Sequence, residues 1–316
     1  MELTEDGLLA AVRKVLSGAG PDVVIPIGDD AAVVRPGSGD LVLTTDALVE
    51  GTHFERAWST AGEIGAKAIA VNLSDVAAMG ASPRFALCAL TLSDDVDAAW
   101  AIEAFGGMRQ VCDEFACTLV GGNLARGREV TLAVMITAEV APGRAVRRSG
   151  ARTGDALVVT GALGGAGAGL RCVRRGAPWT DPERDAMRRL VRPVPRVGEG
   201  QALAAAGATA MLDVSDGLAI DLHRLCEAGG VGARIVEAAI PVHPAATLAD
   251  ALGGGEDYEL LAAVPPEAAD VAEEELRATF GTTLTRIGEV TDGPVVVVDD
   301  AGRERPIGDA GWDHFR

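Results

Sequence analysis

Short apolar segments that lead into acidic turns recur along this chain and constrain its fold more than any other feature. Carboxylates near strand ends are costly to bury without a compensating positive charge, and Lys14 and Lys67 are the only lysines. Oxygen ligands of this kind suit Mg²⁺, which bridges carboxylates and nucleotide phosphates. An ordinary N-cap or turn aspartate explains any single turn, but not five in one chain. The turns are Gly28-Asp29-Asp30, Thr44-Thr45-Asp46, Asn72-Leu73-Ser74-Asp75, Asp213-Val214-Ser215-Asp216-Gly217 and Gly254-Gly255-Glu256-Asp257.

The net charge limits the partners of the chain. At −18, it argues against nucleic acid or an anionic membrane as the main partner, because both require basic surface. A phosphorylated small molecule remains compatible if metal ions supply the positive charge. The length of 316 residues favours two domains over a single core.

The cysteines indicate a reducing compartment. Their number is odd and they show no zinc-type pairing, and the N-terminus has no apolar signal segment. The apolar runs are too short to span a bilayer and are interrupted by charge. We therefore expect a cytoplasmic protein without membrane contact. The five cysteines are Cys88, Cys112, Cys117, Cys172 and Cys226.

Hydrophobic periodicity predicts alternating helices and strands. In the first half, helices are expected over 4–17, 60–80 and 95–115, and strands over 23–27, 32–34, 41–45, 85–92, 118–120 and 130–140. Thr60 and Glu63 have capping-box spacing, and Asn72 and Asp75, three residues apart, should share a helix face. In the second half, strands are expected over 156–160, 211–214, 258–264, 284–290 and 295–298, and helices from 165 to 206, over 218–227 and over 267–280.

The segment from Pro142 to Asp155 is rich in Gly and Arg, and we expect it to be a linker. Both halves mix helices with short strands, which favours two α+β domains. We expect an N-terminal domain over 1–141 and a C-terminal domain over 142–316.

Several familiar motifs are absent. The stretch Gly161 to Leu170 lacks both the ending of a P-loop and the glycine spacing of a dinucleotide fingerprint, and fits a tight strand-to-helix turn. The stretch Asp213 to Gly217 lacks the remaining ligands of a calcium loop. Protein-kinase signatures are missing. The histidines His53, His223, His243 and His314 show no metal-binding spacing.

Taken together, the acidic turns and their neighbours closely resemble the thiamine-monophosphate kinase family of the aminoimidazole-ribonucleotide-synthetase-like superfamily. The stretches Asn72-Leu73-Ser74-Asp75 and Gly254-Gly255-Glu256-Asp257-Tyr258-Glu259-Leu260 are specific, whereas Gly28-Asp29-Asp30 alone is weak. The resemblance spans nearly the whole chain in order. Its other segments are Thr44-Thr45-Asp46 to Phe54, Ala70 to Ala81, Gly121-Gly122-Asn123, Arg148-Ser149-Gly150, Asp213 to Gly217 and Gly311 to Phe315.

The resemblance implies ATP-dependent phosphorylation of thiamine phosphate to thiamine diphosphate. It implies an N-terminal mixed-sheet domain that pairs into a β-barrel across a homodimer and binds Mg²⁺ and ATP, and a C-terminal domain that completes the active site. ATP would be co-substrate, with contacts from Gly122, Asn123, Arg148 and Ser215. Thiamine phosphate would contact His53, Glu256 and Trp312. Several Mg²⁺ ions would be held by Asp30, Thr44, Thr45, Asp46, Asp75, Asn123, Asp213 and Asp216.

The chain departs from the family pattern at Asn123, where aspartate is usual. An amide oxygen can bind Mg²⁺ but brings no negative charge and should bind it more weakly. Phosphoryl transfer requires mainly positioning and charge neutralisation, and the acceptor oxygen is already anionic. We therefore assign no covalent nucleophile and no general base.

Other superfamily activities remain to be distinguished. A hydrogenase-maturation dehydratase acts through a C-terminal cysteine, whereas this chain ends Asp313-His314-Phe315-Arg316. Selenophosphate synthetase needs a reactive cysteine or selenocysteine near its N-terminus, and the first cysteine here is Cys88. Aminoimidazole ribonucleotide synthetase is a further alternative. A non-catalytic sensor of Mg²⁺ and nucleotide is an alternative of a different class.

Overall fold

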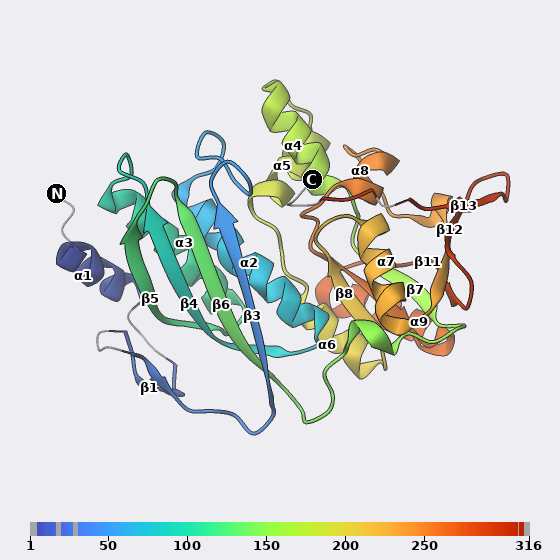
Figure 1. Ribbon diagram of the computed structural model, residues 1–316, viewed down its shortest axis with the longest axis horizontal. Coiled ribbons are helices and arrows are strands. Elements are labelled where there is room, and N and C mark those ends of the chain that lie inside the picture. The colour runs from blue at the N-terminus through green and yellow to red at the C-terminus, as the bar shows by residue number, and fades with distance from the viewer. Residues whose placement is uncertain (1–4, 17–19, 28–30, 309, 313–316) are drawn as a thin grey trace. The chain divides into compact units, whose positions relative to one another are not determined.

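The computed structural model describes residues 5–16, 20–27, 31–308 and 310–312. They form two compact units, one comprising residues 1–76 and 82–143 and the other residues 77–81 and 144–316. Each unit mixes helices and strands, so the chain has a two-domain α+β fold with mixed sheets (Figure 1). No helix in the described ranges has the length and apolar character needed to cross a membrane.

The first unit is built on a sheet in the order β3-β6-β4-β5, in which β4 and β5 run parallel and the other pairs antiparallel. Helices α2 and α3 lie across one face of this sheet (Figure 1). Its elements are α1 (Glu5–Val15), β1 (Val23–Ile25), β2 (Val33–Val34), β3 (Asp40–Val49), α2 (Ala61–Ala78), β4 (Ser82–Leu92), α3 (Ala98–Glu114), β5 (Thr118–Arg126) and β6 (Thr131–Val140).

Strand alternation divides this sheet into a covered face and an open face. On β6, Leu132, Val134 and Ile136 are fully buried beneath the helices. On the opposite face of β3, Leu41 and Leu43 are exposed. The capping box predicted at the start of α2 is confirmed, because the Thr60 amide donates to Glu63 Oε2 at 2.8 Å and the Glu63 amide donates to Thr60 Oγ1 at 3.2 Å.

The second unit is built on a larger mixed sheet in the order β13-β12-β9-β11-β7-β10-β8. Its elements are η1 (Arg148–Gly150), β7 (Ala156–Thr160), α4 (Gly165–Arg175), α5 (Asp181–Val191), α6 (Val197–Ala205), β8 (Ala210–Val214), α7 (Leu218–Gly229), β9 (Gly232–Val236), η2 (Glu237–Ala239), α8 (Leu248–Gly253), β10 (Glu259–Val264), α9 (Pro266–Phe280), β11 (Leu284–Thr291), β12 (Val295–Val298) and β13 (Glu304–Pro306).

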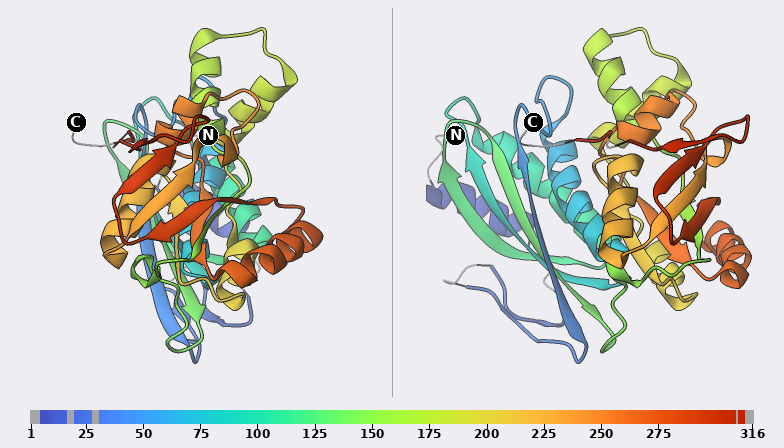
Figure 2. Two further views of the ribbon diagram at one scale, coloured as in Figure 1. Left: turned by 90° about the vertical axis from the view of Figure 1, so that its right-hand side faces the viewer. Right: turned by 45° about the vertical axis from the view of Figure 1, so that its right-hand side comes forward.

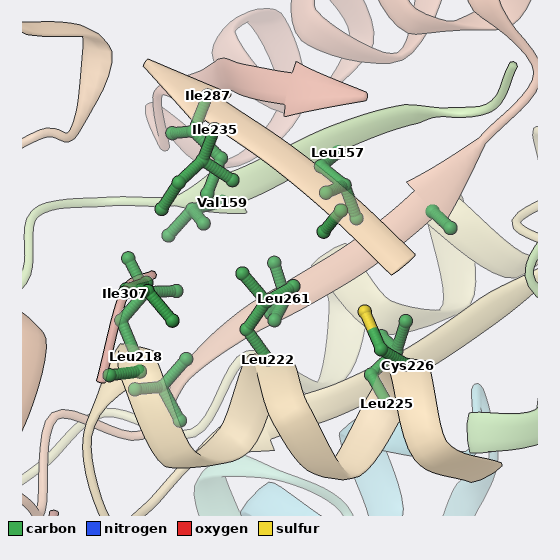
Figure 3. Packing of buried hydrophobic residues seen from close by; sticks show 14 of the residues in the cluster. Leu157, Val159, Leu218, Leu222, Leu225, Cys226, Ile235, Leu261, Ile287 and Ile307 are labelled. Atoms are coloured by element: carbon green, nitrogen blue, oxygen red, sulfur yellow. The ribbon is translucent and has the colours of Figure 1, made fainter. Parts of the chain in front are cut away.

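Strands β7, β8 and β10 are buried along their whole length, as expected where both faces of a sheet are covered. Helix α7 packs on one face, where its apolar residues meet those of the sheet (Figure 3), and α9 contacts β7 and β11. The two views of Figure 2 show α4 and α5 projecting as a helical hairpin. The side chains labelled in Figure 3 include Leu157, Val159 and Leu261 from the strands and Leu218, Leu222 and Leu225 from α7.

Candidate functional site

In the first unit, the polar residues of β3 and α2 meet on the covered face of the sheet. The Thr44 hydroxyl donates to Asp75 Oδ2 at 2.5 Å. The Asp46 amide donates to Asn72 Oδ1 at 3.0 Å. Thr44 and Asp46 are two residues apart on a strand and therefore point to the same face. The prediction that Asn72 and Asp75 share a helix face is confirmed, since both side chains contact β3.

Asn72 fixes the register between the strand and the helix. Its side chain is completely buried, and its Nδ2 donates to the Ala68 carbonyl within α2 at 3.0 Å. The amide oxygen is thereby turned toward β3, where it accepts the Asp46 amide. A buried amide with both ends hydrogen-bonded specifies one geometry.

The turn after β3 holds His53 in one orientation. Its Nδ1 accepts the Val49 amide at 3.1 Å, so in the neutral ring the proton resides on Nε2. The carbonyl of His53 accepts a hydrogen bond from Lys67 Nζ at 2.9 Å. Lys67 is only 2% exposed. The turn is thus fastened to α2, and the His53 ring is oriented through Nδ1.

The open face of the same sheet carries a pocket of about 810 Å³. Thr45, Gly122 and Asn123 line it together with apolar side chains such as Phe85 and Met135. The Thr45 hydroxyl donates to the Val134 carbonyl at 2.9 Å. The structure therefore brings Thr44, Asp46 and Asp75 together but places Thr45 and Asn123 on the other face of the sheet. Asp30 lies outside the described residues.

In the second unit, two loops meet because the end of β8 pairs with the start of β10. Val214 is opposite Glu259 in this antiparallel pair, so the loop after Val214 lies beside the loop before Glu259. The Glu256 amide donates to the Ser215 carbonyl at 2.7 Å, and the Tyr258 amide donates to the Val214 carbonyl at 2.9 Å. Glu256 is thereby placed next to Ser215.

The loop before β10 has a strained backbone. Glu256 and Tyr258 have φ angles of 68° and 51°, a region that side chains other than glycine adopt at a cost. Asp257, between them, accepts the Gly164 amide at 2.5 Å and the Ala166 amide at 3.1 Å. Asp257 as a residue is half-buried, yet burial of its carboxyl raises its pKa to about 7.

A residue that the sequence did not single out, Asp221, organises the loop after β8. Its Oδ2 accepts the amides of Ser215, Asp216 and Gly217 at 3.1, 3.0 and 3.2 Å. Burial raises the pKa of Asp221 above its ordinary value. An acidic residue in the first turn of α7 was the available signal, but only the fold shows that its carboxylate turns back onto three amides.

Three further predicted residues belong to the second unit. Asp213 is buried at the end of β8. Arg148 lies in η1 and is exposed. The Trp312 amide donates to the Asp216 carbonyl at 3.0 Å, and the residue is 50% exposed. The structure thus brings Trp312, Ser215, Asp216 and Glu256 into one neighbourhood.

The donor chemistry of these clusters fits Mg²⁺. Within the described ranges, no three His, Cys, Asp or Glu residues form a cluster that could hold a metal ion by themselves. Mg²⁺ usually binds one or two carboxylates and completes its shell with substrate phosphates and water. The hydroxyl of Thr44 and the carboxylate of Asp75, in direct contact, are a partial oxygen set of that kind.

Comparison with known proteins defines the class of the chain. Residues 28–140 match the AIR synthase related protein, N-terminal domain, and residues 152–300 match the AIR synthase related protein, C-terminal domain. The chain is therefore an AIR synthase-related protein.

Relatives that match over the full length identify the family within this class. The chain is 39% identical over 334 aligned residues to a thiamine-monophosphate kinase of Escherichia coli (strain K12), covering 100% of this chain and 99% of the relative. A crystal structure of thiamine-monophosphate kinase from Stenotrophomonas maltophilia K279a is 36% identical, with a TM-score of 0.84 over 96% of this chain and 99% of that one. A structure of AaThiL complexed with AMPPCP and TMP is 33% identical, with a TM-score of 0.78 over 99% and 98% of the two chains. The chain belongs to the thiamine-monophosphate kinase family, and it is an enzyme, a kinase.

Proposed function

We propose that the chain transfers the terminal phosphoryl group of ATP directly to thiamine phosphate, forming thiamine diphosphate, with the assistance of several Mg²⁺ ions. Full-length relatives carry the name of this activity, and one related structure is a complex with AMPPCP and TMP. The observation in this chain that carries the proposal is the contact between the Thr44 hydroxyl and the Asp75 carboxylate, with Asp46 next to them on the same face of the sheet.

The reaction joins two anionic groups, so charge neutralisation and alignment dominate its barrier. When bound, Mg²⁺ would neutralise charge on the phosphate oxygens. Thr44, Asp46 and Asp75 in the first unit, and Asp213 and Asp216 in the second, are the residues that would hold these ions. The acceptor oxygen is ionised near neutral pH, which is why no general base is needed.

We assign Gly122 and Asn123 of β5 to the nucleotide. Gly122 has a φ of 156°, and a Cβ at this position would meet the Cys88 carbonyl oxygen at 1.8 Å. Glycine at this position therefore allows β5 to pair closely with β4. Thr45 and Asn123 line the pocket on the open sheet face, and we propose that they supply a hydroxyl and an amide oxygen as further Mg²⁺ ligands. Arg148 and Ser215 are proposed as additional ATP contacts.

We assign His53, Glu256 and Trp312 to thiamine phosphate. Nδ1 of His53 accepts a backbone amide, which fixes the orientation of the ring in the turn after β3. The carboxylate of Glu256 and the exposed indole ring of Trp312 suit the cationic thiazolium ring, which aromatic faces attract.

We further propose that the protein is a homodimer in which the first unit pairs with its copy to form a β-barrel. Strand β3 is an edge strand of its sheet and can be extended by another strand. Leu41 and Leu43 are exposed on the open face, and Leu41 is part of the apolar lining of the pocket. A second copy of the same face would cover these residues.

We keep the cytoplasm as the proposed compartment. Cys88, Cys112, Cys117, Cys172 and Cys226 are free and buried in the structure. Unpaired cysteines are usual where thiols are kept reduced.

The function is tested by incubating the purified chain with ATP, MgCl₂ and thiamine phosphate and measuring thiamine diphosphate after oxidation to its fluorescent thiochrome. Parallel reactions contain unphosphorylated thiamine, formylglycinamidine ribonucleotide or selenide as the alternative acceptor, and one contains excess chelator. Product from thiamine phosphate alone, and only with the metal, supports the proposal. Turnover of ATP with another acceptor but not with thiamine phosphate would overturn it.

A further inference from the structure

Arg224 on helix α7 links two carboxylates of the second unit. Its Nη1 donates to Asp216 Oδ2 at 2.5 Å and to Asp221 Oδ1 at 2.7 Å. The Asp221 side chain is 3% exposed, whereas those of Asp216 and Arg224 are 22% and 38% exposed. One guanidinium thus neutralises an accessible carboxylate and an enclosed one at the same time.

The enclosed carboxylate is fixed independently of Arg224. Its Oδ2 is bound by three consecutive amides of the loop after β8, and only its Oδ1 faces the guanidinium. Asp221 therefore serves as an anchor for both the loop and Arg224. The carboxylate of Asp216 has no comparable constraint, since within the described part of the chain its ion pair is with Arg224.

A cation and a guanidinium compete for the same oxygen. A charge-assisted hydrogen bond as short as 2.5 Å is stronger than a neutral one, and a metal ion that binds Oδ2 must displace it. Because Arg224 is also held by Asp221, it can swing away from Asp216 without losing its second ion pair.

We infer that Arg224 is an internal counter-ion of Asp216, which competes with Mg²⁺ for the Asp216 carboxylate and lowers the affinity of this site for the free ion. The inference rests on the proposed role of Asp216 as a metal ligand. It assigns to Arg224 a positioning and tuning role: the carboxylate stays neutralised and oriented until a metal ion displaces the guanidinium.

The test is direct binding of Mn²⁺, a probe for Mg²⁺, to the nucleotide-free protein, measured by electron paramagnetic resonance of the free ion. Arg224→Gln should bind Mn²⁺ about three- to fivefold more tightly at the affected site, the scale of one partly exposed ion pair. The Mg²⁺ concentration for half-maximal turnover should fall in the same direction. Structural damage to the loop would weaken metal binding instead. The direction of the change in Mn²⁺ affinity therefore distinguishes the two explanations.

A matched control separates a local effect from a change in net charge. Arg234 belongs to the same unit, has a side chain 40% exposed and pairs with Glu304 at 2.9 Å, so Arg234→Gln removes the same charge from a similar environment. It should leave Mn²⁺ binding unchanged. Arg224→Lys, which keeps the charge, should remain near the wild type. An equal increase of Mn²⁺ affinity in Arg224→Gln and Arg234→Gln would overturn the inference.

Two further variants make the outcome decisive. Asp216→Asn tests the proposed ligand role: if Mn²⁺ binding is unaffected, Asp216 is not a ligand and that part of the proposed function fails. If Asp216→Asn weakens Mn²⁺ binding, and Arg224→Gln either leaves Mn²⁺ binding unchanged or weakens it, only the counter-ion inference fails. In the double variant, Asp216→Asn with Arg224→Gln, the loss of Arg224 should no longer increase the affinity for Mn²⁺. Arg224→Met, which keeps the aliphatic stem, replaces Arg224→Gln if the latter does not fold, and the same tightening is required of it.

Discussion

Individual polar side chains in this protein are held by backbone groups as much as by one another. Asn72 accepts the Asp46 amide, His53 accepts the Val49 amide, and Asp221 accepts three amides in succession. Such contacts orient a side chain at little cost because the buried amides need acceptors in any case. The other ends of Asn72 and Asp221 are bound within the protein as well, to the Ala68 carbonyl and to Arg224.

The charge of Asp75 should be essential for turnover. Asp75→Asn keeps the shape of the side chain and an oxygen for the Thr44 hydroxyl but removes the negative charge. We expect kcat to fall at least about a hundredfold, the scale for losing a preorganised electrostatic group, with a raised Mg²⁺ requirement. Steady-state kinetics at several Mg²⁺ concentrations measure both effects.

Asp113→Asn is the matched control for this substitution. Asp113 is an exposed carboxylate on α3 of the same unit, paired with Arg109 at 2.8 Å, and an exposed pair of this kind contributes little. The substitution Asp113→Asn should therefore leave kcat unchanged. Near-normal activity of Asp75→Asn at saturating Mg²⁺ would remove Asp75 from the metal-binding residues.

Asp257 should make stability depend on pH. Its pKa of about 7 in the fold lies above the ordinary value of 3.8, so the folded state binds the proton more tightly than the unfolded chain. The contribution of Asp257 is therefore most favourable below pH 4 and is lost as pH rises through 7. The melting temperature of the wild type should fall between pH 5 and pH 8 more steeply than that of Asp257→Asn. The same dependence of melting temperature on pH in the two proteins would contradict this assignment.

At the level of helices and strands, the sequence predicted the elements that carry strong periodicity and caps. Helix α2 was expected from its Thr60 and Glu63 box, and α7, α9, β4, β7 and β12 lie close to the predicted ranges. Strand β5 was expected to end at Val120 but runs on through Gly121 and Gly122 to Arg126. Glycines weaken a strand in isolation, and parallel pairing with β4 sustains this one.

The sequence did not predict strands β9 and β13, helix α8 or the 3-10 turns η1 and η2. Strand β9 begins directly after a helix that ends in glycines, and its short apolar content is defined by pairing with β11 and β12. Helix α8 has only 6 residues, although Thr247 and Asp250 form a capping box at its start. For the candidate site, the motifs singled out Asp46, Asp75 and Glu256, but they could not separate the two faces of the sheet at Thr45 or reveal Asp221. Both depend on tertiary contacts.

The packing of α2 against α3 depends on glycine at the contact. A Cβ at Gly107 would meet the Gly62 carbonyl oxygen at 1.9 Å, whereas one at the neighbouring Gly106 would have nothing within 4 Å. Gly107→Ala should therefore destabilise the protein by about 1–3 kcal/mol, the usual cost of overpacking. Gly106→Ala should be neutral or stabilise it by up to about 1 kcal/mol through helix propensity. Urea unfolding of both variants measures the difference, and equal destabilisation would show that the close approach is relieved by small shifts.

On the scale of the whole molecule, an acidic chain has to bind anionic substrates and, as we propose, a second acidic copy. The net charge of −18 repels both at long range. Metal ions would offset this repulsion at the substrate sites. For self-association, the apolar open face of the first sheet, with Leu41 and Leu43 exposed, is the source of attraction that the structure provides.

Disrupting that face should dissociate the proposed dimer. Leu41→Glu replaces an apolar side chain that is 64% exposed on β3, and Val271→Glu makes the same change at a residue of α9 that is also 64% exposed. Burying an unpaired carboxylate in an interface is costly, so Leu41→Glu should weaken the dimer by roughly a hundredfold or more, whereas Val271→Glu should not affect it. Light scattering coupled to size-exclusion chromatography distinguishes the 32.3 kDa monomer from a particle of twice that mass. A wild-type protein of monomer mass at micromolar concentration, or a Leu41→Glu variant that remains dimeric at the same concentration as the control, would show that this face does not form the interface.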